Sequence, residues 1–123
     1  MNYVVLRKTG GFYSAYDDSA LIIGYLCNYK VKNGKTGFPL SSIDKVLSIL
    51  DSYKISYIVK DKDNEIRKKD YKKSNKYDIY LKRSRIKNSI NNRINNIVKE
   101  MNDLPYNKLE ELLTIIEEFI YEK

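Results

Sequence analysis

The side chains that this chain of 123 residues lacks limit its chemistry more than those it has. It contains no histidine and one cysteine, Cys27. That excludes histidine-based general-base catalysis, Ser-His triads and nearly every zinc site except one built from carboxylates. The adjacent acids Asp17 and Asp18 are explained by a helix start, because acidic side chains cap and stabilise helix N-termini. We therefore expect no enzyme activity, no metal site and no cofactor.

Basic side chains interleaved with tyrosines are the groups best suited to hold a ligand. The net charge is +7. Residues 61–90 carry eleven Lys and Arg against five Asp and Glu, whereas residues 91–123 carry four against seven. Because cations contact phosphates and aromatic rings stack on bases, the basic region with Tyr71, Tyr77 and Tyr80 is compatible with nucleic-acid binding. A solvated, lysine-rich linker is the alternative explanation.

Strands and helices alternate in the first sixty residues. Apolar and β-branched runs predict strands at residues 3–6, 12–16, 29–32, 35–38 and 55–59, with turns at Gly10-Gly11 and Asn33-Gly34. Helices are expected from Asp17 or Asp18 to Asn28, and from Ser41 or Ser42 to about Tyr53. The order β-β-α-β-β-α-β predicts an α+β fold, in which helices pack on a small mixed sheet.

The composition changes after residue 59. Residues 61–75 are charged and predict a loop or a short extra strand around Ile66, and residues 77–81 form a short amphipathic piece of open type. From about Ser84, apolar residues recur at helical spacing up to a break at Leu104-Pro105, and Asn107 then caps a last helix. We expect an α/β head at 1–62, a basic connecting segment at 63–83 and a C-terminal helical hairpin at 84–123.

Two blocks of the expected head carry a family resemblance. Residues 7–20 read Arg-Lys-Thr-Gly-Gly-Phe-Tyr-Ser-Ala-Tyr-Asp-Asp-Ser-Ala, and Gly37-Phe38-Pro39 precedes a helix that Ser42 opens. In order and spacing, residues 3–60 resemble the N-terminal mismatch-recognition domain of the MutS DNA-repair family. That family has Arg-x-Gly-x-Phe-Tyr-Glu, an aromatic residue, an acidic pair and Ala, and later Gly-Ile-Pro.

The resemblance implies a DNA-reading role for Phe12. In the family the matching phenylalanine enters the minor groove and stacks on a mispaired or unpaired base, and a glutamate hydrogen-bonds to that base. Here Ser14 stands at the glutamate position, so the resemblance implies DNA binding more directly than mismatch discrimination. The chain has no Gly-x-x-x-x-Gly-Lys-Ser/Thr phosphate loop, so the family's ATPase is not expected.

The expected function is non-catalytic binding of nucleic acid, DNA rather than RNA, with a preference for distorted or unpaired sites. The residues expected to contact it are Phe12, Ser14, Arg7, Lys8, Lys30, Lys32, Lys35, Lys68, Lys69, Lys72, Lys73, Arg83 and Arg85.

A protein-interaction role is the alternative. The missing glutamate and the acidic tail at residues 91–123 suit a phage or mobile-element protein that inhibits a host nucleoprotein, for example a CRISPR or other defence complex. The apolar faces of the C-terminal helices need a covering surface, which the sheet, a second copy or a protein partner would supply. No apolar run approaches the ~18 residues of a membrane span, and the single cysteine favours a reducing cytoplasm.

Overall fold

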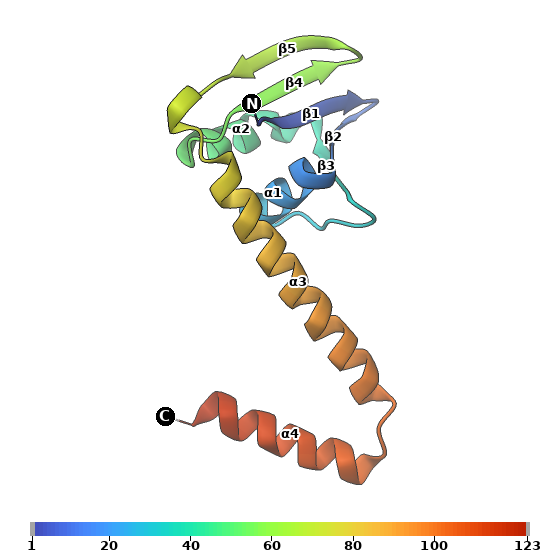
Figure 1. Ribbon diagram of the computed structural model, residues 1–123. Coiled ribbons are helices and arrows are strands. Elements are labelled where there is room, and N and C mark those ends of the chain that lie inside the picture. Colours follow the sequence, from blue (N-terminus) through green and yellow to red (C-terminus); the bar gives the residue numbers. More distant parts are fainter. Residues whose placement is uncertain (1, 123) are drawn as a thin grey trace. The chain divides into compact units, whose positions relative to one another are not determined.

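Five strands form one mixed sheet in the computed structural model, which describes residues 2–122. The strands are β1 (Val4–Thr9), β2 (Phe12–Tyr16), β3 (Lys35–Pro39), β4 (Tyr57–Asp61) and β5 (Asn64–Lys69). Their order across the sheet is β3-β2-β1-β4-β5 (Figure 1). β1 and β4 run parallel, whereas the other neighbouring pairs are antiparallel. The expected α+β class with a mixed sheet is confirmed.

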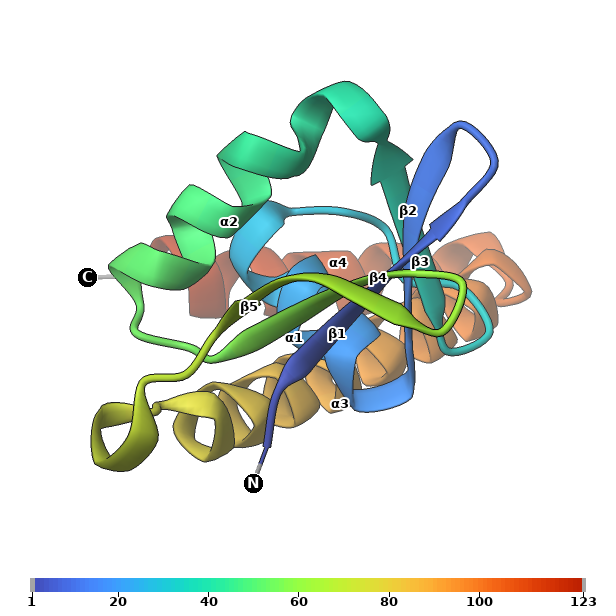
Figure 2. The same cartoon turned by 90° about the horizontal axis from the view of Figure 1, so that it is seen from above.

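Helices supply the rest of the fold. They are α1 (Asp17–Cys27), α2 (Ile43–Ser52), α3 (Tyr77–Asn102) and α4 (Tyr106–Tyr121), with 3-10 turns η1 (Leu40–Ser42) and η2 (Lys72–Ser74). From above, β1, β4 and β5 lie over α1 (Figure 2). The C-terminal helical pair is thereby confirmed, and none of the helices within residues 2–122 is long and apolar enough to cross a membrane.

The core lies between the sheet and its helices. Alternate side chains of the central strands are buried there, including Val4, Leu6 and Val59. Phe38 fills the centre under β2 and β3, with its ring centroid 5.9 Å from that of Tyr13 and 5.6 Å from that of Tyr29. Successive side chains of a strand point to opposite faces of the sheet. The residues between these buried ones therefore point to the other face, away from the core.

The ends of the first two helices follow from their sequences, with small shifts. α1 ends at Asn28, whose φ of 59° is left-handed, as expected for a helix-ending asparagine. Asp17 and Asp18 lie within its first turn and not at the cap, which Tyr16 occupies. In α2, Val46, Leu47 and Leu50 are buried, as the apolar spacing predicts.

The predicted strand at residues 29–32 is wrong. Only one isolated bridge forms there, between Lys32 and Lys35. Tyr29 stacks on Phe38, and Tyr29 and Val31 pack against the core from a loop. Their apolar character therefore reflects packing of a connecting segment and not strand pairing.

The basic segment 63–83 is structured. It contains β5, η2 and the first turns of α3, and β5 pairs with β4 through a bulge at Val59/Lys60. The short extra strand around Ile66 is thus the correct alternative, and the piece at 77–81 is the start of one continuous helix. The observed order is β-β-α-β-α-β-β before α3.

The chain divides into two compact units between Asn88 and Ser89, inside α3. We call the described residues 2–88 the head and the described residues 89–122 the tail. The head is thus longer than the expected 1–62, because β5 and the buried Tyr77 and Leu81 belong to it. In the tail α4 begins at Tyr106 after Pro105, so Asn107 lies in its first turn and is not its cap.

Candidate nucleic-acid interface

The face of the sheet that points away from the core carries polar and basic residues, and we call it the open face. On β1 this open face contains Val5, Arg7 and Thr9, and on β2 it contains Phe12 and Ser14. The strand register places Arg7 beside Ser14 on one side and beside Lys60 of β4 on the other. Two cations are thus neighbours at the middle of the sheet.

Phe12 lies at the tip of the hairpin that joins β1 and β2. Its side chain is 55 % exposed, whereas the next residue, Tyr13, is 8 % exposed and packs in the core. Gly10, with a φ of 61°, makes the tight turn that sets Phe12 opposite Thr9 at the hairpin end of the two strands. An exposed aromatic ring at a hairpin tip is free to insert into or stack on a partner.

Ser14 is placed differently from the role that the resemblance implies. It is 3 % exposed, and its hydroxyl forms a hydrogen bond of 2.9 Å with that of Thr9. It lies on the open face next to Gly37, where a Cβ would come within 3.2 Å of the Tyr13 carbonyl oxygen. Ser14 is therefore part of the sheet's internal packing, and the structure does not present its hydroxyl to a base.

The open face gathers four cations on neighbouring strands, of which Lys60 was missed from the sequence. The four are Arg7, Lys35, Lys60 and Lys68, with Glu65 opposite Lys60. The Nζ of Lys35 lies 5.5 Å from the ring centroid of Tyr16. The Nζ of Lys68 lies 5.1 Å from that of Tyr3. Each pair offers a cation beside a flat aromatic surface, a combination that suits backbone contacts and base stacking.

Other basic residues expected at the site lie elsewhere. Lys8 and Lys69 alternate to the helix-facing side of their strands, and Lys69 lies over the ring of Tyr71 at 5.4 Å. Lys30 and Lys32 are exposed in the loop before β3, and Lys72 and Lys73 are exposed in η2. Arg85 forms an ion pair of 3.0 Å with Asp18. These residues do not share one surface with Phe12.

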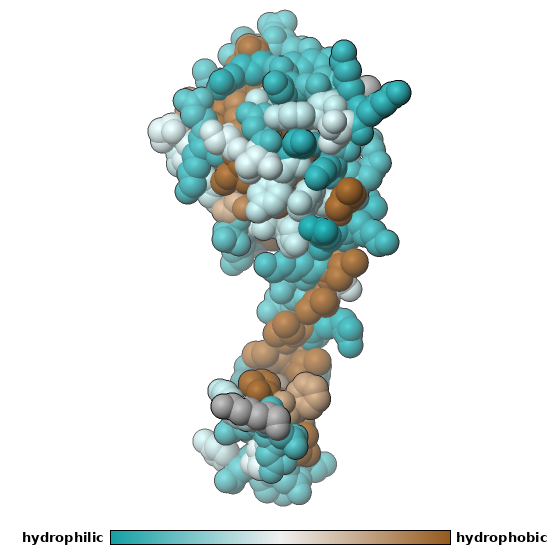
Figure 3. Space-filling model, turned by 90° about the vertical axis from the view of Figure 1, so that its left-hand side faces the viewer, coloured by the Kyte–Doolittle hydropathy of each residue, from teal (hydrophilic) through white to brown (hydrophobic). Residues whose placement is uncertain are grey.

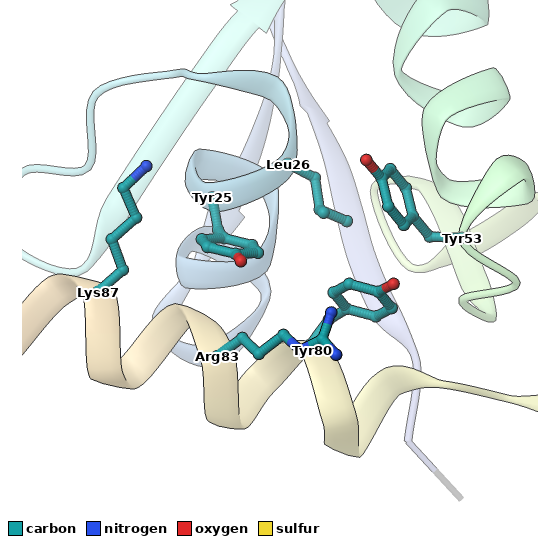
Figure 4. Close-up of a pocket in the computed structure, with 6 residues that line it drawn as sticks. All are labelled: Tyr25, Leu26, Tyr53, Tyr80, Arg83 and Lys87. Carbon is teal, nitrogen blue, oxygen red and sulfur yellow. The ribbon is translucent and has the colours of Figure 1, made fainter.

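A second cluster combines cations with tyrosines on the helical side of the head (Figure 4). It lines a depression of about 310 Å³ with Tyr25, Leu26, Tyr53, Tyr80, Arg83 and Lys87. The Cζ of Arg83 lies 5.1 Å from the ring of Tyr80, and the Nζ of Lys87 lies 5.5 Å from that of Tyr25. The last turns of α1 and α2 carry no basic residue, so these cations of α3 balance the negative helix ends.

The titratable groups with clear pKa shifts have structural explanations. Desolvation and a hydrogen bond from its hydroxyl to the Asp51 carboxylate raise the pKa of Tyr71 to about 12. Burial raises the pKa of the Cys27 thiol to about 11, which makes this thiol a poor nucleophile. Among residues 2–122, no group of three or more Cys, Asp or Glu side chains is arranged to hold a metal ion.

Comparison with known proteins gives no assignment: no protein-family model matches this chain, and no curated protein matches it in sequence.

Proposed function

We propose that this protein is a non-catalytic nucleic-acid-binding protein that contacts DNA with the open face of its sheet. The observation that carries the proposal is the exposure of Phe12 at the hairpin tip, in a strand whose next residue is buried. A large apolar ring held in water by a tight turn contributes little to the fold. Its position favours a role toward a partner.

The surroundings of Phe12 favour a polyanion as that partner. Arg7 and Lys60 stand side by side on the same face, and Lys35 and Lys68 lie further out on it. Phosphate contacts by such cations supply most of the affinity, and they make binding sensitive to salt. The likeness of residues 3–60 to the mismatch-recognition domain of MutS proteins favours the same role.

A preference for distorted or unpaired DNA follows if the Phe12 ring inserts as a wedge between base pairs. Inserting a ring between base pairs costs a few kcal/mol of unstacking, and that cost is lowest where pairing is already broken. Base–aromatic stacking returns about 1–3 kcal/mol. Because Ser14 is engaged with Thr9, we propose that the preference comes from the wedge and not from a hydrogen bond to the base.

A titration with DNA tests this proposal. Wild type, Phe12→Ala and the control Ile66→Ala are titrated with matched duplex, single-base-bulge duplex and single strands at two salt concentrations. Ile66 is a matched control, because it is exposed in β5, away from the hairpin tip. We expect Phe12→Ala to weaken binding to the bulge by about 5- to 150-fold, the equivalent of 1–3 kcal/mol, and Ile66→Ala to leave it nearly unchanged.

Charge substitutions separate phosphate contacts from stacking. Lys68→Ala is expected to weaken binding to all three DNAs alike and to reduce the salt slope by about 1. If wild type binds none of the DNAs at low salt, or binds the matched and bulged duplexes equally, the proposal is wrong.

Inhibition of a host nucleoprotein by a phage or mobile-element protein is the second candidate. It is favoured by α4, whose Glu110, Glu111, Glu117 and Glu118 are exposed beside apolar side chains. Tight, salt-resistant binding to a nucleoprotein without any affinity for DNA would support it in place of DNA binding.

A further inference from the structure

The apolar side of α3 changes part-way along the helix. Tyr77, Leu81 and Ser84 are buried in the head at spacings of four and three. Ile86 follows Tyr77 by nine residues, which is two and a half turns at about 3.6 residues per turn, and so lies on the opposite side. A row of exposed residues continues from it: Ile90, Ile94, Ile97 and Val98. Figure 3 shows these apolar side chains as a stripe along the helix.

A second apolar row runs along α4. Leu109, Leu112, Ile116 and Phe119 are spaced by three, four and three residues, with Leu113 and Ile120 beside them. Phe119 is 84 % exposed and Ile120 is 63 % exposed. In α3, Ile90, Ile94, Ile97 and Met101 are spaced by four, three and four residues. Both rows thus have the heptad spacing of helices that pack side by side.

The tail lacks an interior of its own. Among residues 89–122 no side chain is buried, and Met101, Leu104, Leu109, Leu112 and Ile116 are half-buried. Most of the stability of a helix in a protein comes from the packing of its apolar face and not from helix propensity. The exposed and half-buried isoleucine, leucine and phenylalanine side chains along both rows therefore indicate a surface that a partner covers.

The charges of the two helices identify the partner. Between Tyr106 and Tyr121, α4 carries one lysine and four glutamates, whereas the part of α3 that lies in the tail carries Arg93 and Lys99 against Glu100. At about 100° per residue, Arg93 falls beside the row on α3 and Glu117 falls to one side of the row on α4. A second copy of this chain offers both the acidic and the basic helix, so each helix finds its complement in the other copy.

We propose that the tail is a homodimerisation element in which two copies form an antiparallel four-helix bundle. In this dimer α3 of one copy packs along α4 of the other, and both apolar rows are buried. Specific dimers use about 20–30 residues from each partner, which the two helical segments supply. The dimer does not depend on the DNA-binding proposal, although it would give a DNA-binding protein two heads and a higher effective concentration at neighbouring sites.

The mass of the full chain in solution tests the dimer. Light scattering and sedimentation are measured on nuclease-treated protein over a range of concentrations, at low and high salt. We expect a mass twice the 14.5 kDa of one chain, with dissociation on dilution. High salt is expected to weaken the dimer modestly, since apolar burial supplies most of its stability.

Paired substitutions assign the interface. Ile94→Glu and Phe119→Glu each place a carboxylate in one apolar row, and we expect each to raise the dissociation constant by roughly tenfold or more, because burying an unpaired charge is costly. Thr114→Glu is the matched control on the opposite side of α4, and we expect it to remain dimeric.

The helical circular dichroism of each variant shows whether its tail is folded, and the thermal transition shows that its head is unchanged, since all three positions lie in the tail and are exposed. A wild type that stays monomeric over the whole concentration range overturns the proposal. A dimer that Ile94→Glu and Phe119→Glu leave intact overturns it equally.

Discussion

The head and the tail use the same apolar side chains in opposite ways. In the head, Leu6, Phe38 and Val59 lie within a closed core between sheet and helices. In the tail, isoleucine and leucine follow helical spacing just as regularly, yet among residues 89–122 none is buried. Apolar periodicity therefore predicts which side of a helix is covered, but not whether the cover comes from the same chain.

Polar groups show the same contrast. In the head, the Ser56 hydroxyl accepts a hydrogen bond from the Tyr71 amide, and the Asn75 side chain accepts one from the Ser56 amide. These bonds tie the segment after β5 to the start of β4. In the tail, the side-chain bond of Thr114 reaches only Glu110, one turn earlier in its own helix. The side-chain hydrogen bonds of the head join distant segments, whereas that of Thr114 stays within one helix.

The largest expected effect comes from a cavity in the head. Phe38→Ala removes a buried ring that contacts Tyr13 and Tyr29, and we expect it to lower the free energy of unfolding by about 3–5 kcal/mol. Ile115→Ala, at an exposed tail position off the apolar row, is expected to change it by no more than about 0.5 kcal/mol. Urea unfolding measures both. Equal effects would remove the distinction between a closed head and an open tail.

The reactivity of thiols sharpens the distinction between the two units. With its pKa raised to about 11, the Cys27 thiol should be almost entirely protonated at neutral pH. We expect it to react with a disulfide reagent about a hundredfold more slowly than a cysteine introduced by Thr114→Cys on the exposed side of α4. Denaturation should equalise the two rates, and equal rates in the folded protein would contradict the partial burial of Cys27.

Where the sequence carried a clear local signal, the fold was predictable. The row Ile43, Val46, Leu47 and Leu50 specifies α2, and the paired glycines specify the hairpin of β1 and β2. β5 carried little signal, because all six of its residues are exposed and an edge strand needs no apolar alternation. The sequence predicts α3 as two pieces because the apolar residues of this single helix change sides between Ser84 and Ile86.

The candidate site was predictable only in part. The turn and the alternation of β2 place Phe12 outside and Tyr13 inside, and both follow from local sequence. The burial of Ser14 depends on its bond to Thr9 across the hairpin, and Lys60 joins the open face only through the parallel pairing of β1 with β4. Such placements depend on contacts between distant segments, which composition and spacing do not encode.

Two glycines test how closely the head is packed. A Cβ at Gly24 in α1 would lie 2.5 Å from Cγ2 of Val31 and 3.0 Å from the Tyr29 carbonyl oxygen, whereas a Cβ at Gly11 would meet nothing within 4 Å. We expect Gly24→Ala to destabilise the head by about 1–3 kcal/mol, because overpacking outweighs the gain in helix propensity. Gly11→Ala should be within about 0.5 kcal/mol of wild type. If Gly24→Ala leaves the free energy of unfolding in urea unchanged, the loop at residues 29–31 shifts at little cost to make room for the added methyl group.

The smallest expected effect is a pH dependence at the edge of the head. The Tyr71 hydroxyl donates a hydrogen bond to Asp51, and we expect Tyr71→Phe to cost about 0.5–1.5 kcal/mol at neutral pH. The pKa of this hydroxyl is raised from 10.0 to about 12 in the folded protein, so its contribution is fully present below pH 10 and is lost as the pH rises toward 12. The stability difference between wild type and Tyr71→Phe should therefore shrink over that interval. Comparing the two proteins cancels the titration of the other tyrosines and the lysines, and a difference that stays constant would show that the hydrogen bond does not control the ionisation of Tyr71.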